Sequence, residues 1–330
     1  MDNIQPLSQL QGHKAPVITA EYAKNTILGN HVLASGSEDK TCRLWDLQSN
    51  KVIKGLSGFH EPVTSIKFAT KSSMPYMYLS SGTKVYTFDL RNQGMLLTEP
   101  IHTYEFSQDE INQIDVHENN QFLATADDEG SVQIIDLNTH KIHKKTSKKH
   151  SNICMTVKFR PKKPWEVWSG GMDSKVYNWD FSRGLPTHIY DMSQKEASAK
   201  QMFNPPFVHT MAISPDGTWI AAGLGDTSIQ LISPPSKKQK TQIEKRLEDG
   251  HNTMVNCLSF LTHEQLLSGS TNGRVTLWNI TSLDKQVFQL DHSMGKLNSL
   301  QAWMHDRIEF AAAGTSIHHA GALNIYTIKA

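Results

Sequence analysis

A polar triplet with fixed spacing recurs along this chain of 330 residues and constrains its fold more than any other feature. A serine is followed four residues later by Asp or Asn, and six residues after that by tryptophan. Each triplet follows a loop histidine and lies among short runs of alternating apolar and polar residues, which is typical of half-buried β-strands. A unit that repeats in this way predicts an array of similar small sheets. The three sets are His13, Ser35, Asp39, Trp45; His150, Ser169, Asp173, Trp179; and His251, Ser268, Asn272, Trp278.

These residue types have a chemical reason to stand together. In a small four-stranded sheet, the loop histidine can bond the acid in the turn between the second and third strands. It can also bond the serine hydroxyl on the second strand, beside the tryptophan N–H of the third. Because buried polar groups must be paired, we predict a hydrogen-bond network that locks each sheet. The catalytic alternative is a Ser-His-Asp triad, but a triad is built once and this set recurs beside a tryptophan. We therefore expect no catalytic residue and a protein that is not an enzyme.

The pairs Gly12-His13 and Trp45-Asp46 carry a family resemblance. Gly-His followed roughly thirty residues later by Trp-Asp resembles the WD40 repeat. The resemblance implies an all-β, seven-bladed WD40 β-propeller with one four-stranded blade per repeat. A strand-like run at residues 6–11 would complete the last blade and close the ring, which removes two exposed sheet edges. We expect a single domain over residues 1–330, with approximate repeats at 12–46, 58–91, 106–137, 150–180, 207–233, 250–280, and 291–330 plus 5–11.

Several repeats lack part of the polar set. The second unit has no acid in its middle turn, and the third has Thr125, Glu129 and Ile135 at the Ser, Asp and Trp positions. We expect apolar packing to replace the network in the third unit. In the fifth unit His209 is displaced, so we expect it to stay outside a network. Two polar inserts, 193–206 and 234–240, are predicted to be loops.

The sharpest functional candidate is the segment Phe88-Asp89-Leu90-Arg91 at the end of the second unit. An aromatic residue, Asp, any residue and Arg resemble the motif by which many WD40 proteins dock on the adaptor of cullin-4 ubiquitin ligases. The resemblance implies that Arg91 offers its guanidinium at the bottom rim and that Asp89 holds the turn. Arginine suits this contact because its planar donor fork is never deprotonated. The alternative is an ordinary exposed arginine after a strand. In the fourth unit the corresponding Arg183 comes one residue late and matches less well.

The loops of the opposite, top face form a second candidate. Acids concentrate in the early units, so an acidic mouth would hold a basic peptide such as a histone tail. The alternative is that these loops are polar simply because they face water. The candidate residues are Glu38, Glu61, Asp109, Asp127, Asp128, Asn152 and Met172.

Composition limits the other classes of function. The net charge of +1 gives no overall attraction for nucleic acid or membrane. No apolar run approaches the roughly 18 residues of a membrane helix. Cys42, Cys154 and Cys257 lie far apart in strand-like runs, as expected for core residues in a reducing compartment. The first residues show no signal-peptide pattern, so we expect a cytoplasmic or nuclear protein.

Histidines and lysines offer weaker candidates. No histidine pair has Cys or carboxylate neighbours at ligand spacing, so we expect no metal and no cofactor. The basic run at residues 140–150 could bind phosphate groups or an acidic peptide, but it lacks interleaved aromatics. A solvated loop is the interpretation that its composition favours.

The sequence therefore predicts a monomeric platform that binds protein partners. The first hypothesis is a substrate receptor of a cullin-4 RING ubiquitin ligase, with the ligase adaptor and an unknown substrate as partners. The alternative is a scaffold in a chromatin or RNA-processing complex that binds a peptide on its top face.

Overall fold

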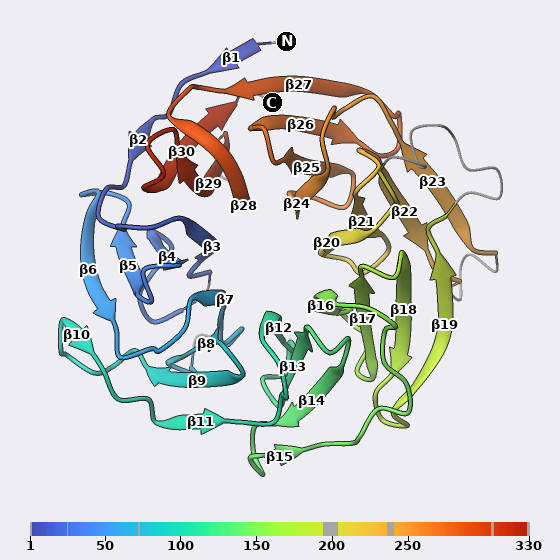
Figure 1. Ribbon diagram of the computed structural model, residues 1–330, viewed down its shortest axis with the longest axis horizontal. Helices are drawn as coiled ribbons and strands as arrows, with labels where there is room; N and C mark the ends of the chain where they lie inside the picture. Colours follow the sequence, from blue (N-terminus) through green and yellow to red (C-terminus); the bar gives the residue numbers. More distant parts are fainter. Residues whose placement is uncertain are drawn as a thin grey trace.

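The computed structural model describes residues 2–24, 26–71, 73–193, 204–235, 241–304 and 307–328. Seven sheets surround a central axis, as Figure 1 shows. This arrangement confirms the predicted all-β, seven-bladed β-propeller. We number the blades along the chain, and we call the end that holds the turns between second and third strands the top face. No helix among the described residues is long and apolar enough to cross a membrane.

Within each blade the strands follow one another from the axis outward. The innermost strands are β3 (Val17–Tyr22), β7 (Val63–Phe68), β12 (Ile111–Val116), β16 (Cys154–Phe159), β20 (Val208–Ile213), β24 (Val255–Phe260) and β28 (Met294–Met304). The second strands are β4 (Val32–Ser37), β8 (Tyr76–Ser81), β13 (Phe122–Asp127), β17 (Glu166–Gly171), β21 (Ile220–Leu224), β25 (Gln265–Ser270) and β29 (Ile308–Ser316). The third strands are β5 (Cys42–Asp46), β9 (Lys84–Asp89), β14 (Val132–Asp136), β18 (Lys175–Asp180), β22 (Ile229–Ser233), β26 (Arg274–Asn279) and β30 (Gly321–Ile328). The outer strands are β6 (Lys51–Leu56), β11 (His102–Tyr104), β15 (Lys141–Ile142), β19 (Leu185–Asp191), β23 (Ile243–Leu247), β27 (Lys285–Leu290) and, for blade 7, β2 (Ser8–Gln9).

The N-terminal segment closes the ring. Strand β2 pairs antiparallel with β30 and becomes the outer strand of blade 7, as the sequence predicts. The Leu10 N–H donates to the Leu323 carbonyl at 2.8 Å, and its side chain is buried. First and last parts of the chain therefore share one sheet, which leaves the ring without a seam.

Two further strands lie outside the regular four. Strand β1 (Asp2–Ile4) pairs in parallel with β27 of blade 6, and β10 (Leu96–Leu97) pairs in parallel with β6 of blade 1. Repeat spacing gives no sign of either strand, and we did not predict them. Each covers the outer edge of a blade that already has four strands.

Neighbouring blades pack closely because their second strands carry glycine at the point of contact. A Cβ atom on Gly36 would lie 2.6 Å from Val63 of blade 2, and one on Gly170 would lie 2.4 Å from Val208 of blade 5. Both valines are fully buried. A larger residue at either glycine would push the blades apart, so these glycines set the spacing of the ring.

The predicted inserts are only partly described. Residues 194–203 and 236–240 lie outside the described residues. Beyond the second insert the chain forms β23, an outer strand that the sequence pattern did not indicate. The three cysteines are buried and free, and burial raises the pKa of each thiol.

Candidate functional site

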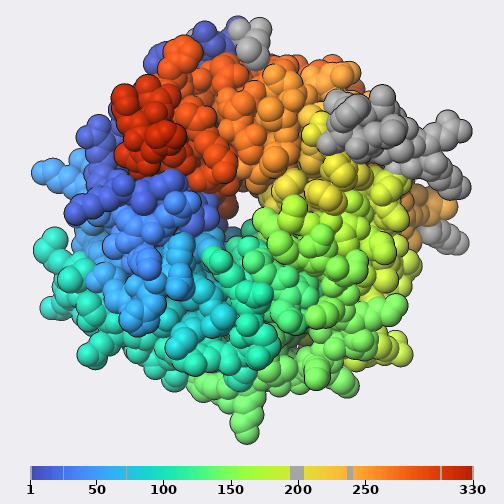
Figure 2. All heavy atoms as spheres, viewed as in Figure 1, coloured from blue at the N-terminus to red at the C-terminus, as the bar shows by residue number. Residues whose placement is uncertain are grey.

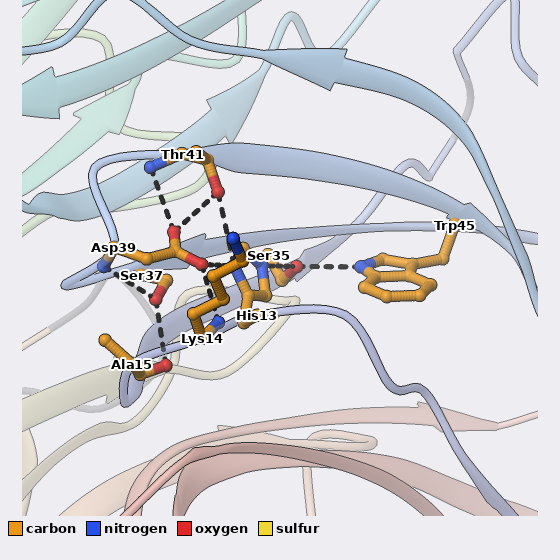
Figure 3. A network of polar contacts seen from close by, with 8 residues as sticks. All are labelled: His13, Lys14, Ala15, Ser35, Ser37, Asp39, Thr41 and Trp45. Carbon is orange, nitrogen blue, oxygen red and sulfur yellow. Dashed lines mark hydrogen bonds and ion pairs between the residues drawn. The ribbon is translucent and has the colours of Figure 1, made fainter.

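The polar set of blade 1 forms a closed network (Figure 3). His13 bonds Asp39 through Nδ1 at 2.9 Å and the Ser35 hydroxyl through Nε2 at 2.8 Å. The Trp45 indole N–H donates to the same hydroxyl at 2.8 Å. Burial opposes ionisation of Asp39, but hydrogen bonds from His13 and Thr41 outweigh it and lower the pKa of this carboxyl. The structure thus brings the four residues together in the predicted order.

Blade 4 repeats this geometry. His150 lies 2.9 Å from Asp173 and 2.8 Å from the Ser169 hydroxyl, and the Trp179 indole N–H donates to Ser169 at 2.9 Å. Burial again opposes ionisation of Asp173, and the bond to His150 prevails and lowers its pKa. The hydroxyl and both rings are buried. No bound substrate could reach such a serine without opening the blade, which favours a structural role over a hydrolase triad.

Blade 6 departs from the predicted set at one position. His251 bonds Ser268 at 2.7 Å and Trp278 donates to Ser268 at 2.8 Å, but the second histidine nitrogen bonds Ser270 at 3.0 Å. Asn272 accepts from Ser270 at 2.9 Å, so it joins the predicted network through this hydroxyl and not through His251 itself. The reason is side-chain reach, since the Ser270 hydroxyl lies within hydrogen-bond distance of both His251 and Asn272. With no acid beside it, burial and the charge of Arg274 lower the pKa of His251 to about 3.

Blades 3 and 5 have other contacts in place of the His-Ser-Asp-Trp network. In blade 3, Thr125 and Ile135 are buried, while Glu129 is exposed and pairs with Lys149 at 3.0 Å. Ile135 packs in an apolar cluster between blades 2 and 3, as expected. Blade 5 contains a different polar set, in which Arg246 of β23 bonds both Asp226 and Ser228.

The sequence pattern did not indicate the role of Arg246. Its partner lies 20 residues earlier, on the other side of the second insert. His209 lines the central channel instead of joining this set.

Arg91 follows the end of β9 at the bottom rim, opposite the top face. Its side chain is 65% exposed, and both its Nε (3.0 Å) and Nη2 (2.5 Å) donate to the Asp89 carboxylate. The Arg91 backbone N–H also donates to Asp89 at 2.9 Å. These bonds lower the pKa of Asp89 and raise that of Arg91. Phe88 is buried and anchors the strand from which the pair projects. The structure therefore places the three predicted residues so that Asp89 orients an exposed guanidinium.

An apolar loop follows Arg91 directly. Met95 is 73% exposed and Leu96 is 63% exposed. The nearly buried amine of Lys54, on blade 1, donates to the backbone carbonyls of Asn92 and Gly94. The loop is thereby fixed against blade 1, and it presents two exposed apolar side chains four and five residues after Arg91. Sequence analysis missed this loop, although two adjacent apolar residues in a polar turn were a signal.

Carboxylates gather on the top face between blades 2 and 3. Glu110 lies among Asp128, Glu61 and Asp109, and burial together with these charges raises its pKa. The backbone N–H of Asp128 donates to the Glu110 carbonyl at 3.0 Å, which links the two loops. We call Glu61, Asp109, Glu110 and Asp128 the acidic cluster. Sequence analysis found three of them and missed Glu110, the residue whose pKa is raised.

The other predicted top-face residues do not form one site. Asp127 is fully buried and accepts from the Ser131 N–H at 2.8 Å, so its prediction as a solvent-facing residue is wrong. It ends strand β13 and its side chain turns inward. Glu38 and Asn152 are exposed, and Met172 is half-buried. Of these, Glu38 lines the channel mouth.

The central channel is narrow and charged. Figure 2 shows the molecule as a disc that is hollowed at its centre, and the cavity there measures about 520 Å³. Lys67 bridges Glu21 at 2.8 Å and lies 3.9 Å from Asp115. Burial and the charge of Lys67 lower the pKa of Lys158 to about 8. Within the lining Lys67 and Glu21 neutralise each other, and the wall also contains Glu38, Glu110, Lys158 and Lys296. Among the described residues no group of His, Cys, Asp and Glu has the arrangement of a metal site.

Comparison with known proteins agrees with this geometry. The family described as "WD domain, G-beta repeat" matches residues 4–46, 98–136, 201–233 and 242–279. These segments contain the three inner strands of blades 1, 3, 5 and 6. These segments, together with the ring of seven blades, show that the chain contains WD40 repeats. Proteins of this family generally act as non-enzymatic scaffolds, and the WD40 propeller described here is a protein-interaction scaffold.

Individual relatives differ in how much of the WD40 chain they match. The "WD repeat-containing protein 53 homolog" of Dictyostelium discoideum is 29% identical over 83% of this chain and 78% of its own length. "Restriction of telomere capping protein 1" of Clavispora lusitaniae is 31% identical over 34% of this chain and 10% of its own length. "Kinesin-like protein KIF21B" of Mus musculus is 22% identical over 84% of this chain but only 17% of its own length. The last two are much longer proteins, and the likeness covers only a small part of each.

Proposed function

We propose that this WD40 propeller is a substrate receptor of a cullin-4 RING ubiquitin ligase and docks on the ligase adaptor through Arg91. The observation that carries the proposal is the exposed guanidinium held by Asp89 at the end of β9. An arginine whose fork is already oriented loses little side-chain freedom when it binds. Such a receptor acts in the cytoplasm or the nucleus.

The surroundings of Arg91 support a protein contact. Met95 and Leu96 add exposed apolar surface on the loop that follows Arg91. Protein interfaces are enriched in Met and Arg, and a few such residues account for most of the binding energy. Lys54 fixes this loop against blade 1.

Binding to the purified adaptor tests the proposal. We expect the wild-type protein to bind and the Arg91→Ala variant to bind at least tenfold more weakly, as for a truncated interface arginine. Arg183→Ala is the matched control, because Arg183 is exposed after the third strand of blade 4. This variant should bind like the wild type. Absence of binding by the wild type would refute the ligase hypothesis, and equal binding by both variants would refute the role of Arg91.

The acidic cluster favours a second candidate function. A scaffold in a chromatin or RNA-processing complex would use it to bind a basic peptide on the top face. Burial and repulsion within the cluster raise the pKa of Glu110, and a bound cationic side chain would relieve the repulsion. A basic peptide that binds the wild type and fails to bind a Glu110→Gln, Asp128→Asn variant would support this role. Retained binding by that variant would exclude it.

A further inference from the structure

The outer edge of blade 3 is incomplete. Strand β15 pairs only two residues with β14, Ile142 with Ile135 and Lys141 with Asp136. Outer strands β6, β19 and β27 of other blades have six, seven and six residues. The His143 N–H still donates to the Ile134 carbonyl at 2.7 Å, and the chain then leaves the ladder and crosses to blade 4, as Figure 1 shows on the outer rim. The first residues of β14, Val132 and Gln133, therefore pair with β13 on their inner side and have no outer strand beside them.

A groove of about 770 Å³ lies where the outer strand of blade 3 would continue. Its apolar surface comes from Phe106 and Ile142, which line it and are half-buried. The Thr146 hydroxyl donates to the Val132 carbonyl at 3.1 Å and the Gln133 amide donates to the Phe106 carbonyl at 2.9 Å. The segments that contain Thr146 and Phe106, on either side of the groove, are thus hydrogen-bonded to β14. A volume in this range accommodates one or two side chains of a ligand and matches typical binding pockets.

Lysines surround the groove. Lys144, Lys145, Lys148 and Lys149 all line it and are exposed. Lys149 pairs with Glu129 at 3.0 Å. Among the described residues, no carboxylate lies within ion-pair distance of the other three ammonium groups. The groove therefore combines an apolar surface with three lysine ammonium groups that have no carboxylate partner among the described residues.

We propose that this groove binds an acidic, extended peptide segment of a partner protein. An aliphatic side chain of the peptide lies on the apolar surface formed by Phe106 and Ile142. Flanking carboxylates pair with Lys144, Lys145 and Lys148. A single-stranded nucleic acid fits less well, since it needs successive aromatic platforms and the groove offers Phe106 alone. The site lies on the outer edge of blade 3 and shares no residue with the proposed adaptor contact.

Fluorescence anisotropy with two labelled peptides tests the proposal. One probe repeats the unit Glu-Glu-Leu-Asp, and the other has glycine in place of leucine. We expect the leucine probe to bind more tightly to the full chain. The triple variant Lys144→Glu, Lys145→Glu, Lys148→Glu should weaken its binding about tenfold or more, since each exposed pair contributes a modest amount. Phe106→Ala should weaken the leucine probe and leave the glycine probe unchanged.

Matched controls separate the groove from general electrostatics. The variant Lys51→Glu, Lys71→Glu, Lys163→Glu changes net charge equally at exposed sites elsewhere and should bind like the wild type. Arg91→Ala should also leave peptide binding unchanged. The proposal is overturned if both triple variants lose affinity equally, or if the two probes bind alike. Tighter binding of a single-stranded RNA of equal charge than of the leucine probe would likewise overturn it.

Discussion

Substituting Ser169 by alanine tests whether the polar network stabilises its blade. Ser169 joins two rings in the interior, since its hydroxyl lies 2.8 Å from His150 Nε2 and 2.9 Å from Trp179 Nε1. In the neutral histidine, Nδ1–H donates to Asp173 and Nε2 accepts from the Ser169 hydroxyl. Trp179 N–H donates to that same oxygen. One set of proton positions therefore satisfies every member.

The expected loss of stability follows from these contacts. Alanine leaves the indole N–H and the histidine Nε2 without a partner, and both lie where water does not reach. A buried polar group left unpaired costs about 1–3 kcal/mol. For the two groups together, with partial relaxation, we expect a loss of about 2–4 kcal/mol in the free energy of unfolding.

Urea unfolding followed by tryptophan fluorescence measures this loss as a lower midpoint at unchanged slope. The matched control is Thr125→Val at the same position of blade 3, where the buried hydroxyl has no hydrogen-bond partner among the described residues. Valine keeps the shape and removes a group that is costly to bury, so we expect no loss, or a gain of up to about 1 kcal/mol. Equal losses for Ser169→Ala and Thr125→Val would refute the argument that the network, and not the packing volume, is responsible.

Two further predictions follow from the geometry. Lys54→Met removes the donor that holds the loop before Met95, so we expect faster hydrogen exchange over residues 92–97, with global stability reduced far less than by Ser169→Ala. Unchanged exchange would show that the amine does not fix the loop. Asp39 and Asp173 have lowered pKa values in the folded state, so the unfolded chain takes up protons first as pH falls. The stability that they contribute is complete above about pH 5 and declines below about pH 4, and Asp39→Asn with Asp173→Asn should flatten that decline in acid unfolding curves.

Repeat spacing was sufficient to predict the ring of blades and the strand that closes it. A network whose members lie at fixed offsets within one unit leaves a signal in sequence, as His13, Ser35, Asp39 and Trp45 do. Pairing between β2 and β30 was predictable for another reason. The last unit lacks a fourth strand, and the strand-like run at residues 6–11 has no blade of its own. The two therefore complete one sheet.

Contacts without a repeat could not be predicted in this way. The Arg246 side chain replaces the loop histidine in blade 5, but it comes from the outer strand and so has no fixed offset from Asp226. Ser270 took the place expected for Asn272, since side-chain reach decides between them and spacing does not. Lys54 meets the loop at Gly94 across two blades, a contact that only the packed ring creates.

The candidate docking surfaces all lie on the blades that depart from the repeat. Arg91 belongs to blade 2, the acidic cluster spans blades 2 and 3, and the lysine-lined groove lies on blade 3. In blade 1, Asp39 is bound to the loop histidine and unavailable to a partner. In blade 3 the same position is Glu129, which faces solvent and pairs with Lys149 at the groove. The residue at this position is thus exposed beside a candidate surface in blade 3, whereas in blades 1, 4 and 6 it is bound within the polar network. Departures from a structural repeat are therefore where a scaffold of this kind should be searched for partner sites.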